Sequence, residues 1–327
     1  MRAWQVVRHG TPAQALALND VAPPEPGPGF LRVRVAAAAL GLPDVLMCRG
    51  AYALTPRLPF TPGQELSGVV EAAGAGARTP VGARVMAVSG FFLGHGSFAE
   101  EALALDDFCF PVPAPLADAE AASFLIPYHT AYVGLVRRAA LQAGESLLVL
   151  GAAGGTGSAA LQLGRALGAR VIAAARGAER SAFCREQGAD AVVDPQREPL
   201  AERVRELTNG RGADVVYDPV GGEAFEAATR AVAHEGRLLA VGFASGRWGQ
   251  VDTAHLVTRN YSVMGVIPSA YDRAFKAEAQ ARLEAWLRDG RLRVPLSRTV
   301  PFAELPAGLE ALAAGGMTGR LALSVAA

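Results

Sequence analysis

The first third of the chain consists of short apolar, strand-like runs that proline and glycine residues separate. This spacing predicts a compact domain made mostly of β-strands. The predicted strands are residues 3–7, 16–21, 31–38, 68–72, 84–88 and 97–103.

From about Leu116 the pattern changes, and apolar strand-like runs alternate with helical stretches. Six strands with helices between them predict a doubly wound parallel sheet. The strands are predicted at residues 146–150, 170–174, 191–193, 215–217, 237–241 and 261–266. The helical stretches between them include residues 159–167, 179–187, 199–208 and 223–231.

After Val266 this alternation stops, and the last part of the chain resumes a mixed pattern. Helical, β-like, helical and strand-like segments follow one another at residues 272–289, 296–300, 303–314 and 320–325. The simplest organisation is an α/β chain in which a cofactor domain interrupts a β domain. Residues 1–116 and 267–327 would form the discontinuous β domain, and residues 117–266 would form the inserted domain.

Composition excludes several classes of protein. The 327 residues are 51% hydrophobic, and 31 basic residues balance 31 acidic ones, so a surface that tracks nucleic-acid phosphates is not expected. No apolar run reaches the roughly 18 residues that span a bilayer. The first residues resemble a strand rather than a secretion signal, which predicts a cytoplasmic enzyme without a membrane partner. Three isolated cysteines favour neither disulfides nor a zinc site.

A glycine-rich turn follows the first strand of the alternating region and leads into a helical pattern. Positions without side chains let the backbone approach a pyrophosphate, and the amide groups at a helix start stabilise the anion. We therefore predict a dinucleotide site. Its residues are Gly151, Ala153, Gly154, Gly155, Thr156 and Gly157.

The second strand indicates which nicotinamide coenzyme binds. An acidic residue at its end would bind the ribose diol of NADH, but Arg176 stands there and Arg180 lies one helical turn further on. Guanidinium groups pair with a 2′-phosphate, so the pattern predicts NADPH. The alternative is that one or both arginines are ordinary solvated surface charges.

The glycine turn belongs to a larger set of residues with characteristic spacing. The set comprises Gly144, Glu145, Leu148, Ala152, Ala153, Gly154, Gly155, Gly157, Gln162 and Arg165. It resembles the quinone oxidoreductase and zeta-crystallin branch of the medium-chain dehydrogenase/reductase superfamily. The resemblance implies a GroES-like β domain with an inserted Rossmann domain, and a homodimer.

The resemblance also raises the question of a metal. Zinc-dependent relatives have a cysteine within the segment that matches residues 41–44 and a Gly-His-Glu triplet at 63–65. Here these segments contain Gly41 and Gln64, and residues 86–110 hold a single cysteine, Cys109. Catalytic zinc needs about three protein ligands, so we expect no metal.

The family match implies further site residues. Tyr52 matches a tyrosine of the substrate cleft, where its hydroxyl could bond a carbonyl oxygen or donate a proton. Thr130, Gly242 and Phe243 match positions beside the nicotinamide. The alternatives are that Tyr52 is a partly buried aromatic under a loop, that Thr130 is a helix residue with a local hydroxyl bond, and that Phe243 belongs to the hydrophobic core.

Two departures weaken the transfer of substrate specificity from these relatives. Gly41 stands where many relatives have asparagine, and Pro195 where many have tyrosine. The first removes a side-chain amide from the cleft. The second shifts phosphate recognition towards Arg176 and Arg180.

These residues predict a zinc-independent, NADPH-dependent oxidoreductase that transfers hydride to a small-molecule electron acceptor. The acceptor would be a quinone or an α,β-unsaturated carbonyl compound, whose conjugated system absorbs the charge without a Lewis acid. The competing hypothesis is an NADPH-binding, crystallin-like scaffold with little turnover. A zinc alcohol dehydrogenase is a third possibility, which the missing ligands disfavour.

Overall fold

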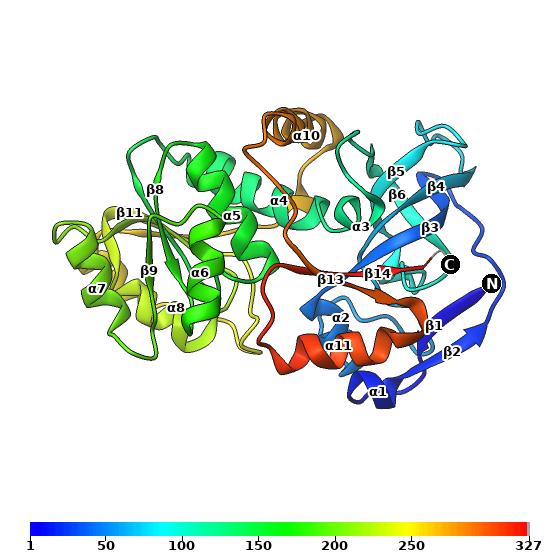
Figure 1. Cartoon of the computed structure of the whole chain (residues 1–327), viewed down its shortest axis with the longest axis horizontal. Coiled ribbons are helices and arrows are strands. Elements are labelled where there is room, and N and C mark those ends of the chain that lie inside the picture. Colours follow the sequence, from blue (N-terminus) through cyan, green and yellow to red (C-terminus); the bar gives the residue numbers. More distant parts are fainter. Residues whose placement is uncertain (326–327) are drawn as a thin grey trace. The chain divides into compact units, whose positions relative to one another are not determined.

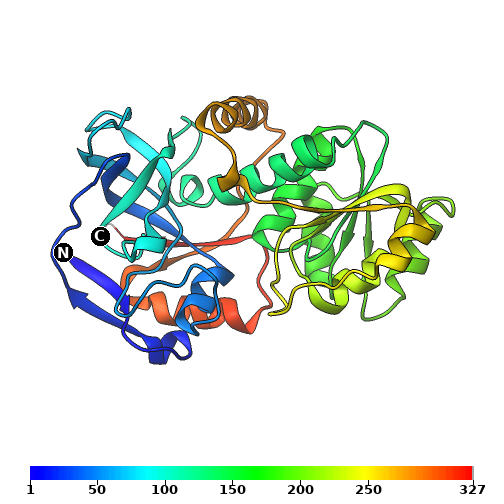
Figure 2. The same ribbon diagram turned by 180° about the vertical axis from the view of Figure 1, so that it is seen from behind.

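The computed structural model describes residues 1–325, and they form two compact units (Figures 1 and 2). The first unit comprises Met1–Ile126, Asp272–Lys276 and the chain from Val294 onward. The second comprises Pro127–Tyr271 and Ala277–Arg293. The predicted domain ends at residues 116 and 266 stay a prediction.

The first unit is built on a sheet with the strand order β13-β14-β3-β4-β5-β6. Its core strands are antiparallel, and an additional β3–β6 pairing closes β3 to β6 into a ring. A separate two-stranded sheet joins β1 and β2. The strands are Arg2–Val6 (β1), Leu16–Asp20 (β2), Phe30–Leu40 (β3), Glu65–Ala73 (β4), Arg84–Ser89 (β5), Glu101–Pro111 (β6), Leu296–Pro301 (β13) and Arg320–Ser324 (β14).

Short helices complete this unit. The longest that lies wholly within it is Leu305–Ala314 (α11), which packs on β3, β13 and β14. A Cβ at Gly308 would lie 3.0 Å from Leu40 Cδ2, so the missing side chain lets α11 approach the sheet closely. The others are Pro12–Ala15 (α1), Leu42–Cys48 (α2), Phe91–Leu93 (η1), Asp118–Ala121 (α3) and Phe302–Glu304 (η4).

The second unit contains the predicted six-stranded parallel sheet, with the order β12-β11-β10-β7-β8-β9. The chain enters at β7, adds β8 and β9 on one side, and then adds β10, β11 and β12 on the other. The point of reversal between β7 and β10 is where such sheets bind ligands. The strands are Ser146–Val149 (β7), Arg170–Ala174 (β8), Ala191–Val193 (β9), Ala213–Asp218 (β10), Val232–Ala240 (β11) and Ser262–Gly265 (β12).

Helices pack on this sheet because its strands are apolar on both faces. α5 packs on β7 and β8, α6 and α7 on β9, and α8 and α9 on β11; Figure 1 labels α5 and α6 beside β8 and β9. Leu148, Ile172 and Leu238 are fully buried between them. The helices are Leu125–Tyr132 (α4), Val133–Arg138 (η2), Gly155–Ala166 (α5), Ala178–Glu186 (α6), Leu200–Leu207 (α7), Gly222–Thr229 (α8), Thr253–Arg259 (α9), Pro268–Ala270 (η3) and Arg273–Arg288 (α10), of which α4 and α10 have their first residues in the first unit.

Strand β6 differs from the strand predicted at residues 97–103, because it starts at Glu101 and continues to Pro111. Two aspartates, Asp106 and Asp107, interrupt the apolar pattern there. Asp106 is nevertheless buried, since its carboxylate accepts bonds from the Thr79 backbone N–H (3.0 Å) and hydroxyl (2.7 Å) and from the Arg78 N–H (3.0 Å). Burial raises the pKa of Asp106, but these bonds outweigh it and hold the pKa below its ordinary value.

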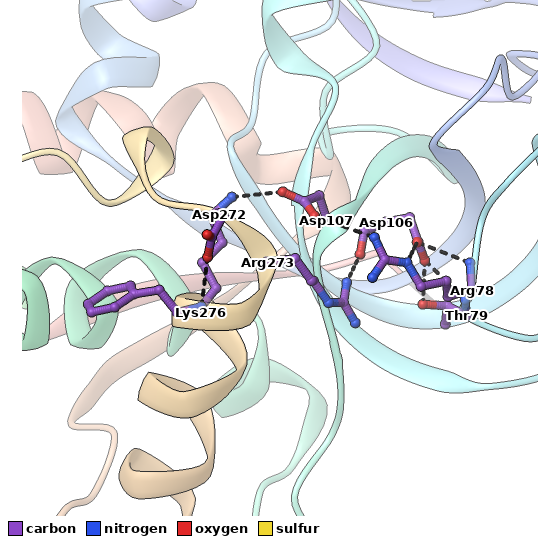
Figure 3. A network of polar contacts seen from close by, with 8 residues as sticks. Arg78, Thr79, Asp106, Asp107, Asp272, Arg273 and Lys276 are labelled. Atoms are coloured by element: carbon purple, nitrogen blue, oxygen red, sulfur yellow. Dashed lines mark hydrogen bonds and ion pairs between the residues drawn. The ribbon is translucent and has the colours of Figure 1, made fainter.

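The same segment of β6 holds the start of α10, as Figure 3 shows. Arg273 donates to the backbone carbonyl of Asp106. Lys276 pairs with the Asp107 carboxylate at 3.1 Å and lies 5.1 Å from the centre of the Phe108 ring. These contacts explain why residues 272–276 belong to the first unit.

Five α-helices were not among the predicted elements: α1, α2, α3, α4 and α9. Helices α1, α2 and α3 are short, α4 continues into the π-helical segment η2, and α9 exposes Val257 almost fully. Such segments lack the apolar stripe that marks a surface helix in sequence. Within residues 1–325, no helix is both long enough and apolar enough to cross a membrane.

Candidate functional site

The glycine turn lies at the carboxyl end of β7, where α5 begins. Gly154 is the N-cap of α5, and its N–H donates to the Gly151 carbonyl oxygen at 3.0 Å. Gly151 has a φ of +54°, a conformation that favours glycine. Helix geometry leaves the first amide groups of α5 without intrahelical acceptors, so they are available to an anion.

Gly157 shows why the turn tolerates no side chain at that point. A Cβ there would lie 2.4 Å from the Gly151 carbonyl oxygen and 2.7 Å from Ala152 Cα. At Gly154, by contrast, a Cβ would meet only the Gly151 oxygen, at 3.4 Å, and the residue is exposed. Gly157 is therefore required by packing, whereas Gly154 and the half-buried Gly155 present bare backbone to a ligand. This cradle fits a pyrophosphate.

The remaining predicted residues of the turn frame this cradle. Ala153 is buried, with 5% of its surface exposed, and Thr156 is half-buried on the first turn of α5.

Asp218 organises the neighbouring strand end. It is the last residue of β10 and is 1% exposed, and its carboxylate accepts the Val220 N–H (2.8 Å) and the Gly221 N–H (3.0 Å). Burial raises the pKa of Asp218 from its ordinary 3.8 to about 6, although these two bonds oppose the rise. A Cβ at Gly151 would lie 2.8 Å from Val220 Cγ2, so the turn held by Asp218 contacts the glycine turn.

The predicted residues Gly242 and Phe243 follow β11 in the same part of this unit. The Gly242 N–H donates to the Asp218 carbonyl oxygen at 3.3 Å, and a Cβ at Gly242 would lie 3.0 Å from the Pro219 oxygen. The Phe243 ring is half-buried and lies 4.5 Å from the Trp248 ring, centre to centre. The structure thus brings the loops after β7, β10 and β11 together.

Arg176 and Arg180 lie after β8, as predicted. Arg176 is exposed, and Arg180 is half-buried in the first turn of α6. The Asp194 carboxylate closes this turn by accepting the Gly177 N–H at 2.9 Å. That bond is the main cause of the lowered pKa of Asp194, to which the charge of Arg176 also contributes. Within the described residues, Asp194 forms its ion pair with Arg197, at 3.9 Å, and not with Arg176. The Asp194 carboxylate therefore does not occupy the Arg176 guanidinium.

Thr130 and Tyr52 lie in different units. Thr130 is buried in α4, in the second unit, next to His129, whose Nε2 lies 2.9 Å from Gln280 Oε1. Tyr52 lies in the first unit and is half-buried in a turn. Its carbonyl oxygen accepts the Thr55 N–H (3.0 Å) and hydroxyl (2.6 Å).

Residues 41–44 and 63–65, which match the zinc-ligand segments of relatives, contain a buried aspartate that is bonded to backbone N–H groups. Asp44 is 1% exposed, and it accepts the Gly41 N–H (2.8 Å) and the Gly63 N–H (3.1 Å). Burial raises the pKa of Asp44 to about 7 against the effect of these bonds. The neighbouring Glu65 accepts the Ile126 N–H at 2.8 Å and pairs with Arg320.

This donor set does not fit zinc. Gln64 offers an amide, Gly41 offers no side chain, and the two carboxylates are engaged by backbone N–H groups or by Arg320. Within residues 1–325, no three histidine, cysteine, aspartate or glutamate side chains come together as a metal site.

Sequence reasoning did not identify Asp218, Asp44 or the Glu65–Arg320 pair as organising residues. Asp218 had a signal, since an aspartate that ends a buried strand and precedes two glycines commonly caps a turn. The Glu65–Arg320 pair had no local signal, because 255 residues separate its members.

Comparison with known proteins places both units. Residues 27–114 match the family described as alcohol dehydrogenase GroES-like domain, and residues 155–284 match the family described as zinc-binding dehydrogenase. The quinone oxidoreductase-like protein 2 homolog of Nematostella vectensis is 36% identical over 274 residues, which cover 82% of this chain and 74% of that protein.

Solved structures agree with this placement. A probable oxidoreductase from Mycobacterium abscessus has a TM-score of 0.87 and 38% identity, and the match covers 99% of this chain and 98% of that one. Escherichia coli quinone oxidoreductase, solved as a complex with NADPH, has a TM-score of 0.91 and 26% identity over 99% of this chain and 100% of that one. The predicted α/β fold class, with GroES-like and Rossmann parts, is confirmed.

Asp218 gives a test of the site's electrostatics. Because its pKa is higher in the folded than in the unfolded chain, its stabilising effect is fully present below pH 3.8 and is lost as pH rises through about 6. Relative to Asp218→Asn, the native protein should therefore lose roughly 2 to 3 kcal/mol of unfolding free energy over this window. Urea unfolding of both proteins between pH about 4 and about 8 measures the change. A difference that stays constant with pH would contradict the raised pKa.

Proposed function

Because the chain belongs to the quinone oxidoreductase family of the medium-chain dehydrogenase/reductase superfamily, we propose that it transfers hydride from NADPH to a quinone or an α,β-unsaturated carbonyl compound. The observation that carries the proposal is the cradle at the start of α5, in which Gly157 lies against the Gly151 carbonyl. Two arginines after β8 support NADPH over NADH.

In this proposal NADPH supplies the hydride, and the chain binds and orients it. Amide groups at the start of α5 bind the pyrophosphate, and the guanidinium groups of Arg176 and Arg180 bind the 2′-phosphate. Thr130, Gly242 and Phe243 border the nicotinamide. The Tyr52 hydroxyl donates a hydrogen bond to the carbonyl oxygen of the acceptor, where charge develops as hydride arrives.

We propose that the reaction needs no zinc. A quinone or an enone spreads the incoming charge over its conjugated system, so a Lewis acid is less necessary than for a simple alcohol. The protein then contributes alignment and the exclusion of water. The poor fit of Gly41 and Gln64 to zinc supports this interpretation. We likewise propose that the acceptor is a small molecule and that the protein is cytoplasmic.

The competing function is an NADPH-binding scaffold with little turnover, and one observation favours it. Gly41 brings no side-chain amide, and its backbone N–H is already bonded to Asp44.

An assay with purified protein distinguishes the two functions. The protein should oxidise NADPH when it is given 1,4-benzoquinone or a small enone, and the fall in absorbance of the reduced nicotinamide measures this oxidation. Tight binding of NADPH without oxidation by either acceptor would favour the scaffold and reject hydride transfer.

Arg176 tests the choice of coenzyme. Arg176→Ala should weaken NADPH binding by about tenfold or more and leave NADH binding within about twofold, because only NADPH carries the phosphate that the guanidinium pairs with. Fluorescence titration with each coenzyme measures both constants. Arg211→Ala is the matched control, since Arg211 is an exposed arginine of the same unit that follows α7. Equal losses for both coenzymes would reject the proposed role.

We also propose a homodimer that forms through the second unit. Strand β12 is an edge strand that pairs with β11 on one side. Two exposed apolar residues flank it in sequence, Val257 (81% exposed) and Ile267 (60%). An open strand edge beside apolar side chains is complementary to a second copy of itself across a twofold axis.

Light scattering during size-exclusion chromatography tests the dimer. The native protein should have twice the chain mass of 33.8 kDa, and Val257→Asp should shift it towards 33.8 kDa, because a charge would be buried in the interface. Val81→Asp, a change at a residue 61% exposed in the first unit, should leave the mass unchanged. A monomeric native protein would refute the dimer.

A further inference from the structure

A second polar hollow lies in the second unit, away from the glycine turn. It has a volume of about 460 Å³, which is within the range of small-molecule sites. It lies beside the last turns of α5 and α6 and the segment after α10. Four arginines line it: Arg165, Arg185, Arg291 and Arg293.

The base of the hollow is built from buried amides. Gln162 and Gln187 are 4% and 5% exposed, and Gln162 Nε2 donates to Gln187 Oε1 at 2.9 Å. The Arg293 backbone N–H donates to Gln162 Oε1 at 2.9 Å, and Arg293 Nε donates to Gln187 Oε1 at 3.4 Å. The bonds from Gln162 Nε2 and Arg293 Nε both end on the Gln187 Oε1 atom. Within residues 1–325, the Gln187 Nε2 atom has no acceptor. The Gln187 Nε2 atom is accessible to solvent, so this N–H₂ group is available as a donor beside the hollow.

Two of the arginines, Arg291 and Arg293, cap the ends of helices. Arg291 donates to the Ala166 carbonyl oxygen, and Arg293 Nη2 donates to the Glu186 carbonyl oxygen at 2.7 Å. Both carbonyls lie at the end of a helix, where cations are favoured. Capping accounts for these two residues.

Arg165 and Arg185 also lie in the last turns of α5 and α6, but in the described part of the chain neither guanidinium donates to a helix-end carbonyl. Both are exposed, and in the described part of the chain neither guanidinium has a carboxylate within 4 Å. The Arg165 stem packs over Gly188, where a Cβ would lie 2.7 Å from Arg165 Cδ, so its position is constrained. Glu186 is the one acid among the lining residues, which leaves an excess of positive charge in a concave space. Such a concentration of charge attracts anions.

We propose that this hollow binds a phosphate group. Guanidinium forks match the geometry of phosphate oxygens, and the Gln187 amide adds a neutral donor. The site is separate from the predicted coenzyme site, because Arg165 is about 15 Å along α5 from Gly155 at the helical rise per residue. It therefore goes beyond the proposed hydride transfer and does not depend on it.

Calorimetric titration with inorganic pyrophosphate at fixed ionic strength tests the site. The native protein should bind it, and the double variant Arg165→Gln with Arg185→Gln should bind it at least about tenfold more weakly, because two charge-assisted contacts are lost. Arg211→Gln, which removes the same charge elsewhere in the unit, should bind as the native protein does. Unchanged binding by the double variant, or none by the native protein at millimolar concentration, would overturn the proposal.

Three further arms complete the test. If the double variant fails to fold by circular dichroism, Arg185→Gln alone should still weaken binding by about threefold or more, and an unchanged constant would overturn the site. Gly154→Val, which places a side chain in the cradle predicted to bind the coenzyme's pyrophosphate, should retain the pyrophosphate binding that Arg185→Gln loses, which separates this hollow from the coenzyme site. Titration with AMP then identifies the source: tighter binding than inorganic phosphate indicates a nucleotide, and equal binding indicates the phosphate group alone. The quinone assay can fail without changing these outcomes.

Discussion

The contact between Gly157 and the Gly151 carbonyl fixes the candidate site. A Cβ at Gly157 would lie 2.4 Å from that oxygen, so α5 can start directly against the end of β7 only if residue 157 has no side chain. This close start aims the unpaired amides of the first turn of α5 at the space above the sheet. The loops after β10 and β11 then pack beside the glycine turn, whose position this contact has already set.

Buried carboxylates hold the loops in both units. Asp218 accepts two backbone N–H groups after β10, and Asp44 accepts two at the start of α2 and beside β4. Burial raises the pKa of both groups, to about 6 and about 7, which is the cost of removing a carboxylate from water. The backbone amides offset part of this cost, because they would otherwise be unpaired inside the protein.

The two ends of α5 suit different chemistry although they belong to one helix. At its start, glycines expose N–H groups and leave room for phosphate oxygens. At its end, the last carbonyl groups require donors, and Arg291 supplies one to Ala166. Arginines recruited near helix ends also create the excess positive charge of the hollow lined by Arg165 and Arg185. The helix ends favour these cations, and the excess of cations over acids in the hollow is in turn what attracts an anion.

The sequence by itself determined the doubly wound sheet, the glycine turn and the arginines after β8, because these depend on residues that are neighbours in the chain. Strands β8 and β9 were predicted with their observed bounds, since strands buried on both faces form continuous apolar runs. Only the tertiary structure decided the course of β6, where Arg78 and Thr79 satisfy the buried Asp106, and the pairing of Glu65 with Arg320. Partners this distant in sequence leave no local periodicity, so folding had to bring them together before their roles were visible.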